Sequence, residues 1–315
     1  MNLQTKIPLK KQEHNLIDYN SKVLLFGSCF AENIGDKFNY YKFQNYINPF
    51  GVLFHPIAIQ RLVSNAINGK KFTDEDVFLN NEQFHCFDAH SKVSQQTKSL
   101  LLHQLNASLQ KTSHYLKQAS HVVITLGTAW VYRLIKTNQI VANCHKLPQQ
   151  NFQKQILSVQ NIETALQSII DQIKQVNPKV NFIFTVSPVR HIKDGFIENT
   201  QSKSHLITAI HQVLDSQSFY FPSYEIMMDE LRDYRFYKPD MLHPNETAVQ
   251  YIWERFNDVW MSDLAKSTMD DVAFIQKGLL HKPFNPNSDA HLNFLKKLKA
   301  RQQMLIDKFS FIKFS

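Results

Sequence analysis

The sequence has few glycines and few cysteines, and it has no long apolar run. With only 7 glycines in 315 residues, each glycine is expected to mark a special backbone conformation. The three cysteines, Cys29, Cys86 and Cys144, form no CxxC pair, which argues against a disulfide framework and favours a reducing setting. No stretch of about 18 apolar residues exists, so no membrane span is expected. Residues 1–16 are polar and lack the apolar core of a secretory signal, so a cytoplasmic location is predicted.

A run of lysines and arginines is also missing, although the chain carries a formal net charge of +8. No aromatic RNA-binding motif accompanies the basic residues, so nucleic acid is not an expected partner. The positive charge is interpreted as a surplus of surface lysines that attracts anions weakly. Hydrophobic residues make up 43% of the chain and aromatic residues 12%, which is enough for a real core and argues against disorder.

Short apolar runs alternate with longer segments of helical spacing. The apolar runs lie at residues 23–26, 122–126, 182–186 and, less clearly, 218–221. Apolar residues recur on one helical face at about 97–119, at about 161–176 and after Asn245. Buried strands that alternate with amphipathic helices predict an α/β fold, with a parallel sheet covered on both faces.

The chain from about residue 262 onward looks different. Residues 282–287 read KPFNPN, which is typical of an extended or turning linker. After this linker, leucines and phenylalanines recur among lysines with helical spacing. We therefore expect a domain over residues 1–261 and a C-terminal helical extension over residues 262–315, packed on the domain or on a partner. The sequence leaves the oligomeric state open.

Polar and reactive residues follow the apolar runs. Ser28 follows the first run, residues 127–128 follow the second, and residues 187–191 follow the third. Asp240 and His243 lie in the loop before the last helix of the sheet domain. Open α/β sheets bind ligands beyond the carboxyl ends of their strands, so these residues are expected to share one site.

Ser28 lies between a predicted strand and a predicted helix, and it has two interpretations. As a helix N-cap it would accept a backbone N–H from the first turn. As a nucleophile it would be exposed by a sharp turn at Gly27, and the helix N-terminus would direct N–H groups at an oxyanion. Cys29 is the rival nucleophile, since a thiolate at a helix start is activated.

Asp240 and His243 are spaced so that the acid can reach the imidazole on one loop. Asp240 would bind one ring nitrogen and leave the other for Ser28, as in a serine hydrolase. Pro244 ends the loop, and Asn245 can cap the following helix. The alternative is a solvated pair on a loop, but the Gly-Ser turn after the first predicted strand favours the catalytic interpretation.

Residues 27–31 read GSCFA, and the chain resembles the GSCFA family over about residues 20–260. The further matching stretches are NPFG at 48–51, LGTAWVY at 126–132, VANCHK at 141–146, FTVSPVRH at 184–191 and LRDYRFY at 231–237. The family resembles a branch of the SGNH (GDSL-type) hydrolases. That resemblance implies a three-layer α/β/α sandwich with a central, flavodoxin-like parallel sheet.

The resemblance also implies roles for individual residues. Ser28 matches the nucleophile of the first SGNH block, and Asp240 and His243 match the Asp-x-x-His of the last block. In the second block a glycine normally donates its N–H to the oxyanion, and Gly51 is the candidate here. The backbone N–H of Ser28 is expected to donate beside it.

The third block departs from the family pattern. It normally reads Gly-x-Asn-Asp, whereas this chain has Ala129 at the position of the asparagine. Alanine has no side-chain donor, and loss of one oxyanion donor raises the barrier by about 3 kcal/mol. Either Thr128 or Asn48 replaces that donor, or the enzyme is slow, or the site binds without turnover.

The run HCFDAH at residues 85–90 contains side chains that can bind metals. Because no second Cys/His pair with finger-like spacing is present, no metal site is predicted. The run is interpreted either as a structural loop or as a wall of the site, in which case His90 contacts substrate.

Three further residues are candidates for substrate binding. Arg190 and His191 follow the third apolar run, and Arg235 lies shortly before Asp240. Such side chains hold anionic groups or sugar hydroxyls through forked hydrogen bonds. Structural ion pairs of the arginines are the alternative, with Asp194, Glu230 or Asp233 as partners.

The residues and the resemblance together predict an SGNH-type serine hydrolase. Its expected substrate is an ester, with an O-acyl group on a carbohydrate or other small molecule. Ser28 would form an acyl-enzyme that water releases. A sugar hydroxyl in place of water would make the same site an acyltransferase. The rival is a non-catalytic module that holds a glycan or acyl ligand in the same cleft. No cofactor is expected.

Overall fold

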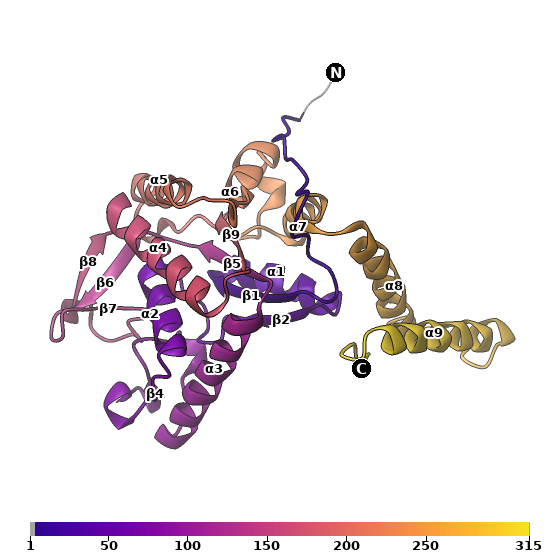
Figure 1. Ribbon diagram of the computed structural model, residues 1–315, viewed down its shortest axis with the longest axis horizontal. Helices are drawn as coiled ribbons and strands as arrows, with labels where there is room; N and C mark the ends of the chain where they lie inside the picture. Colours follow the sequence, from indigo (N-terminus) through magenta and orange to yellow (C-terminus); the bar gives the residue numbers. More distant parts are fainter. Residues whose placement is uncertain (1–3, 315) are drawn as a thin grey trace.

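The computed structural model describes residues 4–314, so the first three residues of the polar N-terminal segment and residue 315 lie outside it. A parallel five-stranded sheet lies at the centre (Figure 1), in the order β10-β9-β5-β1-β2. The strands are β1 (Lys22–Gly27), β2 (Gln44–Ile47), β5 (His121–Leu126), β9 (Asn181–Val186) and β10 (Ser218–Tyr220). Four of them confirm the predicted apolar runs, while β2 is an addition.

Helices cover both faces of this sheet, which confirms the three-layer α/β/α architecture. One face packs against α2 (Pro56–Ile67), α3 (Lys98–Gln118), α4 (Val159–Val176) and α5 (Phe196–Gln212). The opposite face packs against α1 (Cys29–Tyr40) and α7 (Glu246–Trp260). Alternate residues of β1 divide between the two cores, with Leu24 in one and Leu25 in the other. The predicted helices at 97–119, 161–176 and after Asn245 are confirmed as α3, α4 and α7.

The strand order places the functional edge. Numbered along the chain within this sheet, the order is 2-1-3-4-5, the flavodoxin-like arrangement. In that arrangement the connections from neighbouring strands diverge between β1 and β5, and ligands bind outside the carboxyl ends of those two strands. Ser28 follows β1 and Gly127 follows β5, so both lie at this point.

Smaller antiparallel sheets are additions that the sequence reading did not predict. The strands β6 (Trp130–Leu134), β7 (Gln139–Val141) and β8 (Phe152–Ile156) pair in the order β7-β6-β8. They interrupt the chain between β5 and α4 and lie to one side of the main sheet (Figure 1). The hairpin of β3 (Phe78–Asn80) and β4 (Gln83–His85) precedes α3, and the one-turn helix α6 (Ser223–Glu225) follows β10.

Two helices form the C-terminal part, α8 (Asp263–Leu279) and α9 (Asp289–Lys308). They project away from the α/β body in Figure 1, where α9 crosses the end of α8. The end of α9 returns to the body, since the ring of Phe309 stacks on Tyr19 with centroids 5.0 Å apart. No helix within residues 4–314 is both long and apolar enough to cross a membrane.

Candidate active site

The turn between β1 and α1 requires glycine at position 27. Gly27 has a φ of +135°, and a Cβ on it would lie 2.1 Å from the carbonyl oxygen of Thr125. The next residue, Ser28, caps α1, because its Oγ accepts a hydrogen bond from the Phe30 N–H at 3.3 Å. The cap interpretation is therefore confirmed, and Ser28 directly follows the carboxyl end of β1.

Ser28 has no solvent-exposed surface, with a relative exposure of 0%. Residues 53–54 run beside it, because the N–H of Leu53 donates to the carbonyl of Gly27 at 2.9 Å. A Cβ placed on Gly127 would meet both Ser28 Cβ, at 3.3 Å, and the Phe54 ring, at 2.9 Å. Gly127 and Phe54 thus pack beside the Ser28 side chain. Phe54 carries no recognisable sequence signal, because it lies in the loop just before α2.

Asp240 and His243 form the pair that the spacing predicted. His243 Nδ1 lies 2.6 Å from Asp240 Oδ2, and Asp240 Oδ1 accepts the N–H groups of His243 and Leu242 at 3.0 and 2.9 Å. The two backbone N–H groups lower the pKa of Asp240 to about 2. An ionised carboxylate only accepts hydrogen bonds, so Nδ1 carries the proton and Nε2 is left as an acceptor.

The Asp240–His243 loop lies against the segment that follows β9. The Arg190 N–H donates to the carbonyl of Leu242 at 3.4 Å, and the Arg190 side chain donates to Asn199 at 2.9 Å. The ring of His191 lies 5.4 Å from that of Phe54, and its Nε2 is buried without a hydrogen-bond partner in residues 4–314. Burial, followed by the positive charges of Lys203 and His243, lowers the pKa of His191 to about 3. His191 is therefore a neutral imidazole near Phe54, which packs beside the Gly27–Ser28 turn, and near His243.

The Ser28 hydroxyl and the His243 ring are on the same edge of the sheet, but they form no hydrogen bond in the structure of residues 4–314. A chain of contacts joins the two sides. Gly127 touches Ser28, and a buried lysine links the carbonyl of Gly127 to that of Ser187. Catalytic hydrogen bonds often tighten only when substrate binds, so this separation does not remove the pair from a shared site.

That lysine, Lys203 on α5, is a residue that sequence reasoning missed. It is 1% exposed, and its Nζ donates to Gly127 O at 2.9 Å and to Ser187 O at 2.7 Å. Burial lowers the pKa of Lys203 to about 7. The two bonds tie together the carboxyl ends of β5 and β9.

Cys29 does not have the environment of an activated thiolate. Burial and then the charge of Glu32 raise the pKa of its thiol, and Lys203 acts in the opposite direction with a smaller effect. A reactive cysteine needs a lowered pKa. The raised pKa of the Cys29 thiol therefore favours Ser28 over this rival as the nucleophile.

The backbone candidates for the oxyanion hole already have partners inside the protein. The N–H of Ser28 donates to Thr125 O at 3.0 Å, and the N–H of Gly51 donates to Asn48 O at 2.8 Å. The Thr128 N–H donates to Phe54 O at 3.1 Å, and its hydroxyl bonds Ser202 at 3.1 Å. Each of these donors would have to exchange a partner to bind an oxyanion.

Asn48 differs from those three candidates. Its Oδ1 accepts the Gly27 N–H at 2.8 Å, which holds the side-chain amide next to the Gly27–Ser28 turn. Its Nδ2 is buried and has no hydrogen-bond partner among the described residues. A buried amide without a partner is unfavourable by roughly 1–3 kcal/mol, so a donor in this state is available for a ligand oxygen. The residue has a φ of +39°, which asparagine tolerates better than most residues.

The other predicted substrate contacts divide between two positions. His90 lies beside Gly51, where a Cβ would be 2.7 Å from His90 Cβ, and its ring is 6.4 Å from that of Phe54. Arg235 instead pairs with Asp233 at 2.9 Å on the surface, which is the structural alternative.

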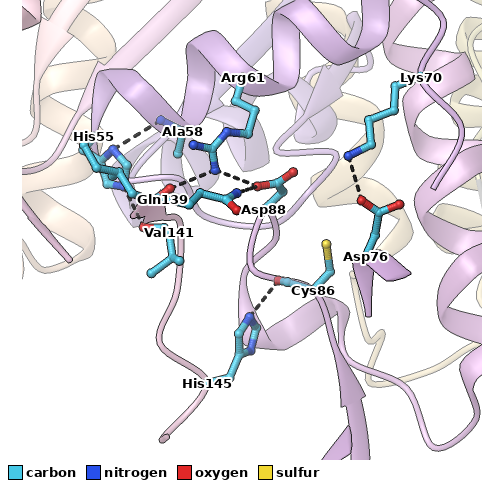
Figure 2. A network of polar contacts seen from close by, with 11 residues as sticks. His55, Ala58, Arg61, Lys70, Asp76, Cys86, Asp88, Gln139, Val141 and His145 are labelled. Carbon is cyan, nitrogen blue, oxygen red and sulfur yellow. Dashed lines mark hydrogen bonds and ion pairs between the residues drawn. The ribbon is translucent and has the colours of Figure 1, made fainter. Parts of the chain in front are cut away.

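The segment at residues 85–90 makes structural bonds (Figure 2). Asp88 binds Arg61 at 2.8 Å and Gln139 at 3.1 Å, and the carbonyl of Cys86 accepts from His145 at 2.8 Å. Within the described part of the chain, no group of three or more histidine, cysteine or acidic side chains is arranged to hold a metal ion. The structural-loop interpretation accounts for these contacts.

The fold and these residues define an α/β protein with a serine turn and an Asp–His loop at the carboxyl edge of a parallel sheet. The sequence matches the GSCFA family over residues 22–256 and the C-terminal domain of GSCFA domain proteins over residues 272–315. The chain belongs to the GSCFA family. No curated protein matches the sequence.

Several solved structures are similar to this chain, among them three esterases. A carbohydrate esterase family 3 protein from Talaromyces cellulolyticus has 11% identity and a TM-score of 0.35, covering 79% of this chain and 99% of its own. A mutant acetyl esterase with acetate ion has 12% identity and a TM-score of 0.37, covering 80% and 99%. An acetyl xylan esterase from the rumen bacterium Butyrivibrio proteoclasticus has 10% identity and a TM-score of 0.39, covering 84% and 66%. These similarities are too low to assign an activity.

Proposed function

We propose that the protein is an SGNH-type serine esterase that removes an O-acyl group from a carbohydrate or related small molecule. The observation that carries the proposal is the 2.6 Å bond between Asp240 and His243 Nδ1, which leaves Nε2 of the imidazole free to accept a proton. Ser28 is the nucleophile because it starts a helix at the ligand-binding edge of the sheet. Membership in a family with the GSCFA run at residues 27–31 supports the same assignment.

The reaction proceeds in two halves. Ser28 Oγ bonds to the acyl carbon while its proton moves to His243 Nε2, and the proton then passes to the alcohol oxygen as the ester C–O bond breaks. Water attacks the acyl-enzyme by the same route and releases the carboxylic acid and the serine. Asp240 orients the imidazole and stabilises it while it is charged. If a sugar hydroxyl takes the place of water, the product is a transferred acyl group.

Asn48 serves as the oxyanion donor in place of the missing third-block asparagine. Its unpartnered Nδ2 is held beside the nucleophile turn by the bond between Oδ1 and the Gly27 N–H. Asn48→Asp keeps an acceptor for that N–H and tolerates the same left-handed φ, but it replaces the amide donor with a carboxylate. We expect kcat to fall by about 10²- to 10³-fold with the fold preserved. An unchanged kcat would remove Asn48 from the mechanism.

The test of the whole proposal is turnover of p-nitrophenyl acetate by the wild type and by Ser28→Ala. Hydrolysis by the wild type that disappears in the variant, with the same circular dichroism spectrum, is the expected result. Cys29→Ala is the matched control, because it alters the neighbouring residue and leaves the hydroxyl in place. Turnover that persists in Ser28→Ala and stops in Cys29→Ala would transfer the nucleophile to the thiol and end the proposal.

A binding module without catalysis is the second candidate, and two observations favour it. Ser28 has 0% exposure, so an ester reaches the hydroxyl only after Phe54 or the segment at Gly127 moves. Ala129 at the usual asparagine position points the same way. The two candidates differ in serine reactivity, since only the esterase activates Ser28 toward an electrophile.

A further inference from the structure

A cavity of about 430 Å³ lies beside the candidate active site, at the small β7-β6-β8 sheet. Of its lining residues, Phe54 lies beside Gly127, which contacts Ser28, and Thr128 directly follows Gly127 in the chain. The cavity therefore lies next to the part of the structure that holds Ser28, the proposed nucleophile. None of the described residues that line it has a role in the proposed proton transfer. Aromatic and neutral polar side chains line the cavity, among them Phe54, Thr128, Trp130, Tyr132, Asn143 and Gln149.

Trp130 is held as a rigid apolar surface in this cavity. Its Nε1–H donates to the carbonyl of Glu198 at 3.2 Å, and the Lys154 ammonium lies 4.7 Å from the ring centroid. The edge of the indole is therefore bonded and one face is covered by a cation. The remaining surface of the ring lines the cavity together with Tyr132, two positions along β6.

The part of the cavity wall at β7, the neighbour of β6 in the small sheet, is held by the polar network in Figure 2. His55 accepts the Ala58 N–H through Nδ1, so its Nε2 carries a proton and donates to Val141 O at 3.1 Å. Arg61 donates to the carbonyl of Ile140 at 2.8 Å. The carbonyls of Ile140 and Val141 in β7 are thus hydrogen-bonded to residues of α2 and its N-cap. This part of the cavity wall is formed without a ligand.

We propose that this cavity binds a neutral sugar ring of the alcohol portion of the ester. Aromatic surfaces stack on the apolar face of a pyranose, and the amides of Asn143 and Gln149 match its hydroxyl groups. Among the described lining residues none carries a carboxylate, and Lys193 is the one charged side chain. The assignment rests on the proposed esterase function for its position relative to the acyl group, but sugar binding itself does not.

The kinetic test compares two esters that differ in the sugar. Trp130→Ala is expected to raise KM for mono-O-acetylated xylotetraose about tenfold, as loss of one stacking surface does, and to leave kcat/KM for p-nitrophenyl acetate unchanged. Trp130→Phe keeps an aromatic face and is expected to retain a KM close to the wild-type value. An equal fall in kcat/KM for both esters, or an unchanged KM for the sugar ester in Trp130→Ala, would overturn the assignment.

A fluorescence titration tests binding without any chemistry. Trp253 and Trp260 are buried and Trp130 is partly exposed, so Trp130 reports on the cavity. Xylotetraose or cellotetraose is expected to change the emission in a saturable way, and Trp130→Phe is expected to abolish the change. No change at tens of millimolar of either sugar would overturn the assignment even if Trp130→Ala does not fold. Saturable binding in a protein that hydrolyses neither ester would retain the sugar site and reject the esterase.

Discussion

Replacing Lys203 with methionine is expected to change how the stability of the protein depends on pH. Lys203 is 1% exposed, and burial lowers its pKa from 10.5 to about 7. Above pH 7 the folded protein therefore loses this proton, while the unfolded chain keeps it until its own pKa near 10.5. The unfolded state then binds more protons, so the free energy of unfolding rises with pH through this window.

The magnitude follows from the two pKa values. The full difference of about 3.5 units corresponds to roughly 5 kcal/mol, which is the penalty for burying the charged form below pH 7. Between pH 6 and pH 8.5 the part of this penalty that is relieved is about 2 kcal/mol. Lys203→Met removes the titrating group. From pH 6 to pH 8.5 the free energy of unfolding of the wild type is therefore expected to rise by about 2 kcal/mol relative to that of the variant.

The assay is urea unfolding followed by circular dichroism at several pH values from 6 to 8.5. The wild-type minus variant difference is used, because buried histidines such as His55, with a pKa lowered to about 4, contribute equally to both proteins. Lys179→Met alters an exposed lysine, and its free energy of unfolding is expected to change with pH as that of the wild type does. A Lys203→Met profile that is also parallel to the wild type would refute the account of a buried, proton-shedding lysine. Equal slopes with urea concentration in all three proteins are required for the comparison.

Three further changes test the site. Gly27→Ala brings a Cβ to 2.1 Å from the Thr125 carbonyl oxygen, so thermal unfolding should show a loss of roughly 3 kcal/mol or more; a near-normal melting temperature contradicts the strained turn. Asp240→Asn is expected to lower kcat for p-nitrophenyl acetate by about 10²-fold or more, because the amide no longer fixes the imidazole tautomer; unchanged kinetics would make the pair structural. Phe54→Ala removes a side chain that packs beside Ser28, so the rate at which a fluorophosphonate labels Ser28 should increase; an unchanged or lower rate would contradict this packing.

The main sheet was predictable because its central strands are buried along their whole length. All residues of β5 and β9 are buried, and both strands stand out as apolar runs. The edge strand β2 has no buried residue, and its sequence QNYI contains no such run. The short strands β6 to β8 are only partly buried, so their pattern is weak.

The candidate site was predictable where a backbone signal accompanied the residue. The Gly-Ser turn predicts a helix cap at Ser28, and the Asp-x-x-His spacing predicts a bond between Asp240 and His243. Both bonds are present in the structure. Lys203 gave no such signal, because a lysine on a helix is ordinarily solvated and only the packing of α5 on the strand ends buries it. Phe54 depends in the same way on contacts between distant segments.

The most direct test of the central claim is labelling of the intact protein with a fluorophosphonate, followed by mass spectrometry of the modified peptide. The account predicts one stoichiometric adduct on Ser28 in the wild type, and labelling slowed by orders of magnitude in His243→Ala, since only an imidazole at that edge takes up the hydroxyl proton. An unlabelled wild type, or an adduct that forms at the same rate without His243, would contradict a serine activated by the downstream loop.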